Sequence, residues 1–332
     1  MRIAILYTGE FRTCEKTIHY TKQNILLNDD VHIFAIIQSQ YENIQHDSNF
    51  IKSHMGLHIK HLTNFNKTDK LWSSIQDELL SNMPIHQCTY NYLKNSGSMI
   101  EYYQAYLAYQ QVLHYEQVNN IKYDYIIRLR TDVIYTQPLT FNFLSLTTGD
   151  IINYFKIIQK HTQGPQLLSV NHIKLFFNNL LSENNKHTRF EANYSNCDIH
   201  YNSGYINNAI SYILNDHIND YVAFEKIREI IHKGKYIITL RKNVFFVIKR
   251  NFFSQIVSLG VTYGKYIGNN NDYWWNAESQ LQEICKINEI SIFDSTTLLE
   301  DKSLYDFQDN NYFNNDNNIA DNLHCLFFIC RN

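Results

Sequence analysis

Short apolar runs alternate with amphipathic stretches along the first part of the chain. The apolar runs are rich in Ile, Leu, Val and Phe, which is typical of strands buried between helix layers. They fall at residues 2–6, 30–37, 58–62 and 123–132. Apolar positions at helical spacing fall between them, at residues 14–25, 67–81 and 99–118. Strands that alternate with helices predict an α/β fold with a parallel sheet and right-handed crossovers.

The helix expected at residues 99–118 has a clear start signal. Ser98 is a suitable N-cap, and Glu101 stands three residues later, where a capping-box partner would lie. The stripe expected to face the core contains Met99, Tyr103, Tyr106, Gln110 and Leu113. Gln104 and Tyr102, near the start of the helix, are candidates to face a ligand.

Further strands are expected late in the chain, at residues 235–240, 244–248 and 290–293. Basic residues bracket the phenylalanines of the second of these strands: Arg241, Lys242, Lys249 and Arg250 surround Phe245, Phe246, Phe252 and Phe253. A buried strand with charged ends is the favoured interpretation, ahead of a surface that binds a membrane or an anionic glycan. The 332 residues suffice for one large domain or two modest ones.

Polar groups gather where the strand at residues 123–132 ends. Arg128, Arg130 and Asp132 alternate with Leu129 and Thr131, so an extended chain projects all three charges to one side. Open α/β sheets bind ligands at the carboxyl ends of their strands. Two cations beside one anion there could hold a diphosphate and its metal, or could simply form an ion pair that closes the strand.

The first strand runs into a turn that contains Gly9, followed by a helix that Thr13 can cap. Strand, glycine turn and helix form the first unit of a nucleotide-binding α/β half. The three-glycine dinucleotide fingerprint is absent, and an ordinary strand-to-helix turn is an equal alternative.

Composition narrows the function classes. A net charge of −3 and a pI of about 6.6 give no electrostatic footprint for nucleic acid. The six cysteines contain no C-x-x-C pair and indicate reduced thiols rather than zinc ligands or a disulfide scaffold. No apolar run is long enough for a signal peptide or a transmembrane helix, so we expect a cytoplasmic protein.

Two later motifs have a structural and a functional interpretation each. Asp220 precedes an expected helix, where a carboxylate is a cap or a catalytic group. Trp274 and Trp275 adjoin Asp272 and could form a sugar-stacking platform or part of the core.

Three motifs occur together in one order: Gly9-Glu10-Phe11-Arg12, then the R-x-R-x-D element at residues 128–132, then short segments at residues 219–230 and 275–293. This order resembles GT-A-fold glycosyltransferases found in surface-polysaccharide clusters and in large DNA viruses. The resemblance is good over residues 1–140 and patchy afterwards. It implies a GT-A-like Rossmann-type sheet flanked by helices, with a nucleotide-sugar-binding half at 1–140 and an acceptor-binding half at 141–332 of one compact domain.

The resemblance implies roles for individual residues. Asp132 matches the last Asp of the family's D-x-D motif and would bind Mn²⁺ or Mg²⁺. The donor-binding residues would be Tyr7, Thr8, Gly9, Arg12, Gln104, Arg128 and Arg130. Arg130 stands where the family has the first Asp, so this arginine could itself neutralise phosphate. Glu10 replaces the family's usual Gln.

The activity implied is transfer of a sugar from a nucleotide-diphosphate sugar, UDP or GDP being favoured, to a hydroxyl of a glycan or other acceptor. Asp220 and Glu278 are the candidate bases, and Trp274 and Trp275 the candidate acceptor-binding residues. If the protein is viral, it would act in the host cytoplasm. A sugar nucleotidyltransferase is disfavoured because the first turn lacks a glycine-rich basic loop. A non-catalytic glycan- or nucleotide-binding protein on a degenerate transferase fold stays open.

Overall fold

The computed structural model describes residues 1–26, 30–68, 70–81, 87–95, 97–135, 233–240, 245–262, 281, 284–285, 288–294 and 327–329. The described strands are β1 Ile3–Glu10, β2 Val31–Gln38, β3 Ile59–Phe65, β4 Tyr125–Arg130, β5 Val133–Tyr135, β6 Tyr236–Leu240, β7 Phe245–Lys249, β8 Ser291–Asp294 and β9 Phe327–Ile329. The described α-helices are α1 Cys14–Ile25, α2 Ile44–Met55, α3 Lys70–Ser81, α4 Gln87–Asn95, α5 Ser98–Asn119 and α11 Arg250–Thr262. Short 3₁₀ turns precede α1 and α2 and link α2 to β3: Phe11–Thr13, Tyr41–Asn43 and Gly56–His58.

A seven-stranded sheet in the order β3-β2-β1-β4-β7-β6-β8 forms the centre of the fold. β1, β2, β3 and β4 are parallel, as the alternating pattern predicts, and β7 runs antiparallel to both of its neighbours. The α/β class is therefore confirmed, with a mixed sheet in place of a purely parallel one. Strands from residues 236–294 extend the sheet that the first 130 residues begin, so both parts of the chain share one sheet.

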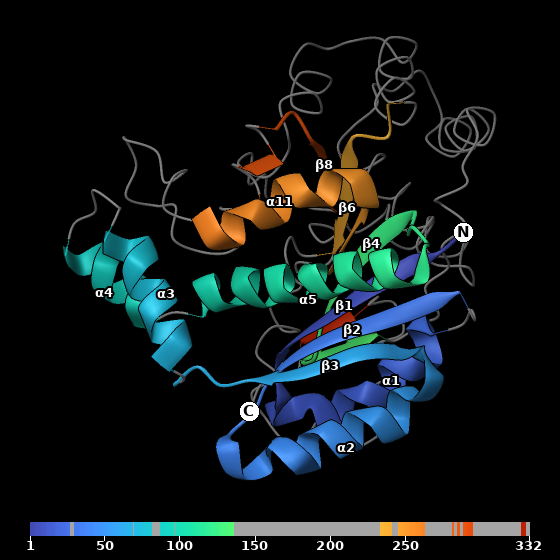
Figure 1. Ribbon diagram of the computed structural model, residues 1–332, viewed down its shortest axis with the longest axis horizontal. Helices are drawn as coiled ribbons and strands as arrows, with labels where there is room; N and C mark the ends of the chain where they lie inside the picture. The colour runs from blue at the N-terminus through green and yellow to red at the C-terminus, as the bar shows by residue number, and fades with distance from the viewer. Residues whose placement is uncertain are drawn as a thin grey trace, which may run out of the picture.

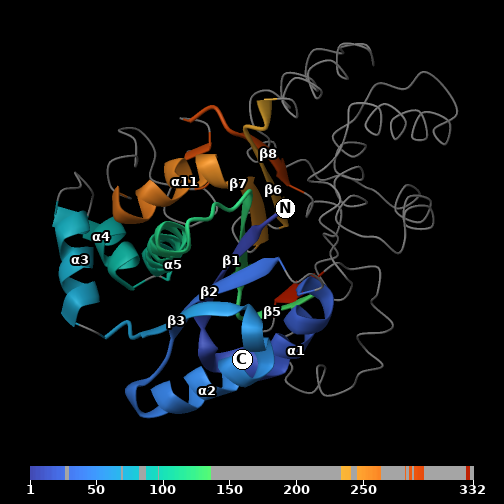
Figure 2. The same ribbon diagram turned by 45° about the vertical axis from the view of Figure 1, so that its right-hand side comes forward.

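Helices cover both faces of this sheet. Figures 1 and 2 show α1 and α2 on one face and α5 and α11 side by side on the other. The core on the α5 side joins buried residues of β1, β2, β4, β7, α5 and α11, among them Leu6, Ile126 and Phe253. α5 packs against both the sheet and α11, and beyond the first two turns its buried positions are Ala105, Ala108, Tyr109, Val112 and Glu116. The predicted single stripe is therefore wrong in part: Gln110 is exposed, whereas Tyr102 and Ala105 are buried.

The start of α5 differs from the prediction. Gly97 occupies the N-cap position, and the helix has no side-chain cap. The carboxylate of Glu101 contacts two arginines of β4. Thr13 likewise stands at the N-cap of α1 without a side-chain cap bond.

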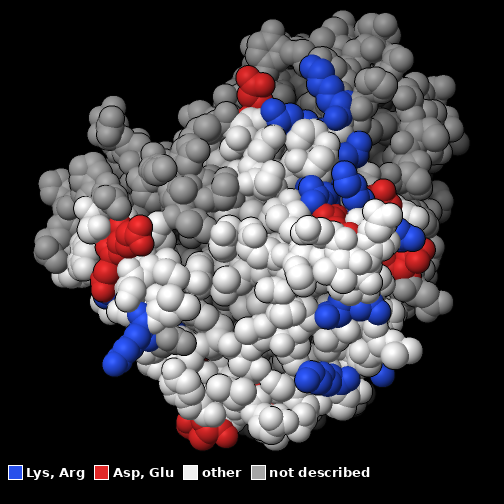
Figure 3. All heavy atoms as spheres, viewed as in Figure 1, with Lys and Arg blue, Asp and Glu red and all other residues white. Residues whose placement is uncertain are grey.

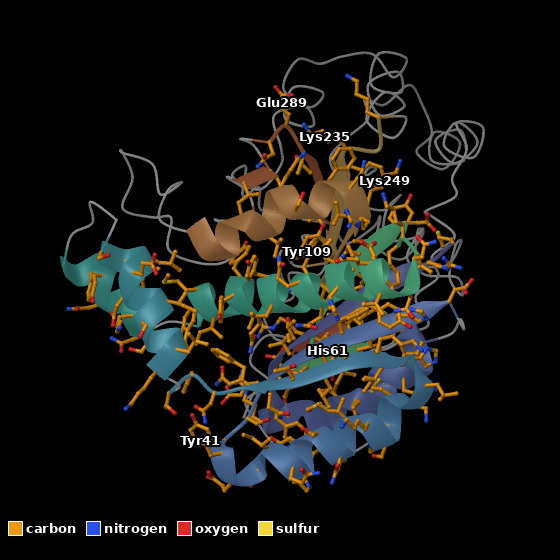
Figure 4. All side chains as sticks on the ribbon, in the orientation of Figure 1. Tyr41, His61, Tyr109, Lys235, Lys249 and Glu289 are labelled. Carbon is orange, nitrogen blue, oxygen red and sulfur yellow. The ribbon has the colours of Figure 1, made fainter. Side chains whose placement is uncertain are left out.

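In the described part of the basic–aromatic stretch, β7 is a buried strand followed by charged residues, whereas Arg241 and Lys242 lie outside the described residues. Phe245, Phe246 and Phe253 are buried in the core, and Arg250 pairs with Glu116 of α5. Figure 3 shows Lys and Arg gathering toward the right-hand edge with Asp and Glu among them, and Figure 4 labels Lys249 near that edge. Within the described residues, no helix has the length and apolar character needed to cross a bilayer.

Candidate functional site

Two central strands, β1 and β4, end beside each other and open onto a cavity of about 280 Å³. Six of the residues predicted to bind donor or metal line it: Gly9, Arg12, Gln104, Arg128, Arg130 and Asp132. The wall is completed by Glu10, Gln38, Lys67, Asn95, Gly97, Ile100 and Glu101. The structure thus brings residues from β1, from α5, from β4 and from the turn after β4 to one place at the carboxyl edge of the sheet.

Glu101 bridges the two arginines of β4. Its Oε2 accepts from Nη2 of Arg128 at 3.3 Å, and its Oε1 accepts from Nη1 of Arg130 at 3.2 Å. The Arg128 side chain is only 4% exposed, and its Nε also lies 3.4 Å from Oγ1 of Thr8. Both arginines therefore project to the α5 face of the sheet, as their alternation in the sequence predicts.

Asp132 is held by arginines on both of its oxygens. Arg130 donates from Nε to Oδ1 at 2.8 Å and from Nη2 to Oδ2 at 2.7 Å, which is a bidentate pair. Arg12 adds a longer contact of 3.4 Å from Nη2 to Oδ2. Burial would raise the pKa of Asp132, but Arg130 and then Arg12 outweigh burial and lower that pKa below its usual value. Asp132 is consequently a buried, ionised carboxylate.

The described residues do not fit a Mn²⁺ or Mg²⁺ site. Both ions require several oxygen ligands, usually including carboxylates that are free to coordinate. Asp132 is committed to Arg130 and Arg12, and Glu101 is committed to Arg128 and Arg130. No group of three His, Cys, Asp or Glu side chains within the described ranges could hold an ion. In this geometry Asp132 acts as a counter-ion of the arginines.

Gly9 lets the end of β1 approach the chain after β4. Its φ of +145° lies in a region that glycine adopts readily. A Cβ atom at this position would lie 2.4 Å from Oγ1 of Thr131, whose hydroxyl donates to the carbonyl of Glu10 at 2.7 Å. Gly9 therefore fixes the spacing between the first turn and the Arg130–Asp132 segment.

We expect Gly9→Ala to lower the free energy of unfolding by about 2–3 kcal/mol, from backbone strain plus the overlap with Thr131. Gly56→Ala is the matched control, because Gly56 also has a positive φ but no atom within 4 Å of its added Cβ. That control carries the backbone strain alone and should lose about 1–2 kcal/mol, less than Gly9→Ala. Chemical denaturation of both variants measures the difference, and equal losses would show that the contact with Thr131 is unimportant.

Gln104 presents an unsatisfied donor in this wall. The residue is 1% exposed, and its Nε2 has no hydrogen-bond partner among the residues that the structure describes. A buried amide N–H without an acceptor is costly. Since Gln104 lines the cavity, an acceptor supplied by a ligand would satisfy it.

Tyr7 and Thr8 do not line the cavity. Successive residues of a strand point to opposite faces, so the two side chains cannot both face a ligand. Tyr7 is fully buried, and its hydroxyl contacts Sγ of Cys14 in α1, at 3.4 Å. Thr8 lies on the α5 face but contacts Arg128 instead of the cavity.

A second, larger hollow of about 700 Å³ adjoins the first along the ends of β1, β2 and β3. It is lined in part by Tyr41, labelled in Figure 4 at the end of the sheet away from Lys249, and by Asp47. The Asp47 carboxylate is 4% exposed, and its Oδ1 lies 3.2 Å from Nδ1 of His46. This hollow gives the site a second compartment that the sequence did not indicate.

Asp220, Glu278, Trp274 and Trp275 lie outside the described residues. Among the described residues, the sequence reasoning missed Glu101, Lys67 and Asp47. The sequence could have indicated Glu101 as a cavity residue, because it lies three positions before Gln104 and therefore on the same face of α5. Lys67 lies two residues after the end of β3, where a carboxyl-edge residue is expected.

No known protein family and no curated protein matches the sequence significantly. Among solved structures, an active-site mutant of LgtC aligns at 13% identity and a TM-score of 0.21, covering 44% of this chain and 43% of the LgtC chain. Core-mannan synthase A from Aspergillus fumigatus, in a Mn/GDP form, aligns at 11% identity and a TM-score of 0.34, covering 88% of this chain and 73% of the synthase chain. The galactosyltransferase LgtC with donor and acceptor sugar analogs aligns at 11% identity and a TM-score of 0.27, covering 87% of this chain and 72% of the LgtC chain. We draw no functional conclusion from TM-scores of this size.

Proposed function

We propose that the protein is a glycosyltransferase that moves a sugar from a nucleotide-diphosphate sugar to a hydroxyl of a glycan or other acceptor. The nucleotide of the donor is UDP or GDP. One observation carries the proposal. Arg12, Arg128 and Arg130 converge with Gln104 and Gly9 on one cavity at the carboxyl edge of a mainly parallel sheet. This edge is where open α/β sheets bind their ligands.

The chemistry needs few groups. The leaving nucleoside diphosphate gains negative charge, which preorganised cations in a partly desolvated wall stabilise. Arginine suits this task because its planar fork matches phosphate oxygens. Glu101 and Asp132 hold Arg128 and Arg130 in place before any ligand arrives.

The larger hollow suits the nucleoside. Asp47 offers a buried carboxylate there, which can accept hydrogen bonds from the N–H groups of a base or from ribose hydroxyls. For an inverting reaction we assign the acceptor base to Asp220, with Glu278 as the second candidate, and acceptor stacking to Trp274 and Trp275. These four assignments rest on the sequence alone.

A thermal-shift panel of UDP, GDP, dTDP and CMP tests the proposal. Ligand that binds only the folded state stabilises it by mass action, so one nucleotide should raise the melting temperature more than the others. The matching nucleotide sugars should then be turned over with an acceptor present. No shift with any nucleotide would refute the proposal and favour a non-catalytic binding protein.

A further inference from the structure

The two hollows meet at a neck that carries positive charge. Four residues line both of them: Glu10, Arg12, Gln38 and Lys67. Arg12 follows β1 and Lys67 follows β3, so the two cations come from separate turns at the same edge of the sheet. A ligand that fills both hollows would therefore lie against these cations.

We propose that Arg12 and Lys67 bind the diphosphate of the donor at this neck, and that this binding needs no divalent cation. The inference rests on the proposed function and adds to it the residues that hold the anion. A nucleotide sugar has its anionic diphosphate in the middle and an uncharged polar group at each end. The order of the site is the same: a hollow of about 700 Å³, a basic neck and a hollow of about 280 Å³.

Arg12 and Lys67 are the cations of this wall with the weakest existing partners. Among the described residues, Arg12 contacts carboxylates only at 3.4 Å, to Asp132, and at 3.8 Å, to Glu10, and its side chain is 38% exposed. Lys67 is exposed and makes no ion pair within the described part of the chain. A phosphate oxygen therefore replaces long contacts and solvent here, without breaking a close ion pair. The orphan Nε2 of Gln104 offers a further donor in the smaller hollow.

The carboxylates of Glu101 and Asp132 orient Arg128 and Arg130 and are therefore poorly placed to bind a divalent metal ion. A divalent ion at Asp132 would have to displace the bidentate Arg130 and would then lie beside its positive charge, which is unfavourable in a partly buried wall. With the carboxylate of Glu10 beside them, Arg12 and Lys67 give the neck a net charge of +1, and they meet the diphosphate without that rearrangement.

Calorimetric titration of UDP and GDP into the full chain, in EDTA and then in Mn²⁺, tests the inference. The nucleotide that binds should have the same Kd in both buffers within about twofold. Arg12→Gln and Lys67→Gln should each weaken its binding about tenfold or more, the effect of losing a charge-assisted hydrogen bond. Lys60→Gln is the matched control, because Lys60 lies at the other end of β3 and donates to the carbonyl of Leu57; its Kd should not change.

Glu10→Gln should change nucleotide affinity in opposite directions, depending on whether cations of the protein or a divalent metal ion hold the diphosphate. Glu10 is the carboxylate at the neck, so removing its charge should tighten nucleotide binding several-fold if cations of the protein hold the diphosphate. Weaker binding in this variant, or binding that requires Mn²⁺, would overturn the inference and leave the proposed function standing. Absence of binding in either buffer would refute both. Unchanged melting temperatures for these surface substitutions exclude loss of the fold as the cause.

Discussion

Replacement of Arg130 by Gln is expected to lower kcat/KM for sugar transfer by about two to three orders of magnitude, the usual cost of one preorganised charge in such a site. Two effects act in the same direction. The variant removes a cation from the cavity wall, and it leaves the buried Asp132 carboxylate without its bidentate partner. An unpaired anion beside the diphosphate repels the charge that develops on the leaving group.

The assay uses the donor that the nucleotide panel identifies. Arg2→Gln is the matched control, because Arg2 is an exposed arginine at the amino end of β1, on the opposite edge of the sheet. That variant should retain full activity. A loss of less than about fivefold in Arg130→Gln would mean that Arg130 is only a strand-end ion pair, the alternative that the sequence left open.

The second large effect concerns stability and lies away from the cavity. Glu116→Ala should lower the free energy of unfolding by about 3 kcal/mol, the lower end of the cost of breaking a buried ion pair. Glu116 is buried and accepts from Nε of Arg250 at 3.0 Å and from the backbone N–H of Tyr123 at 3.0 Å. The Arg250 guanidinium also lies 5.7 Å from the ring centre of Tyr109, which Figure 4 labels on α5.

Loss of the Glu116 carboxylate leaves a guanidinium and a backbone N–H without their acceptor at the junction of α5, β4 and α11. Asp77→Ala is the comparison, because it breaks the more exposed Asp77–Lys94 pair and should cost less than about 1 kcal/mol. Guanidinium denaturation followed by circular dichroism measures both. Equal losses would show that burial does not strengthen the Glu116–Arg250 pair.

Local patterns predicted those parts of the molecule that depend on local geometry. The alternation of charged and apolar residues at 128–132 was enough to place Arg128 and Arg130 on one face, because strand geometry repeats every two residues. The strands β1 to β4 followed from continuous apolar runs. By contrast, α2 was not predicted, because only Asp47, Ile51 and Met55 are buried in an otherwise polar helix.

The site itself depends on contacts that the sequence does not encode locally. The spacing of Ser98 and Glu101 fits a capping box, yet the Glu101 carboxylate pairs with arginines 27 and 29 positions away. Tyr7 lies in β1 near Gly9, which lines the cavity, but its side chain points to the opposite face of the sheet, where α1 packs. The sequence does not show which face α1 covers. Lys67 lines the cavity because the carboxyl end of β3 lies at the same edge of the sheet as the carboxyl end of β1, and the local sequence does not show this.

The position of β7 has a consequence for how the chain can be divided. All the described cavity residues lie within the first 132 positions, which suggests a separable module. However, β4 has β7 as its outer neighbour, and β7 comes from residues 245–249. A fragment that ended after β5 would expose the hydrogen-bonding edge of β4 and the apolar side of α5 that α11 covers, and open edges of this kind promote self-association. The arginine-bearing strand therefore needs a segment encoded more than 100 residues later to be protected from aggregation.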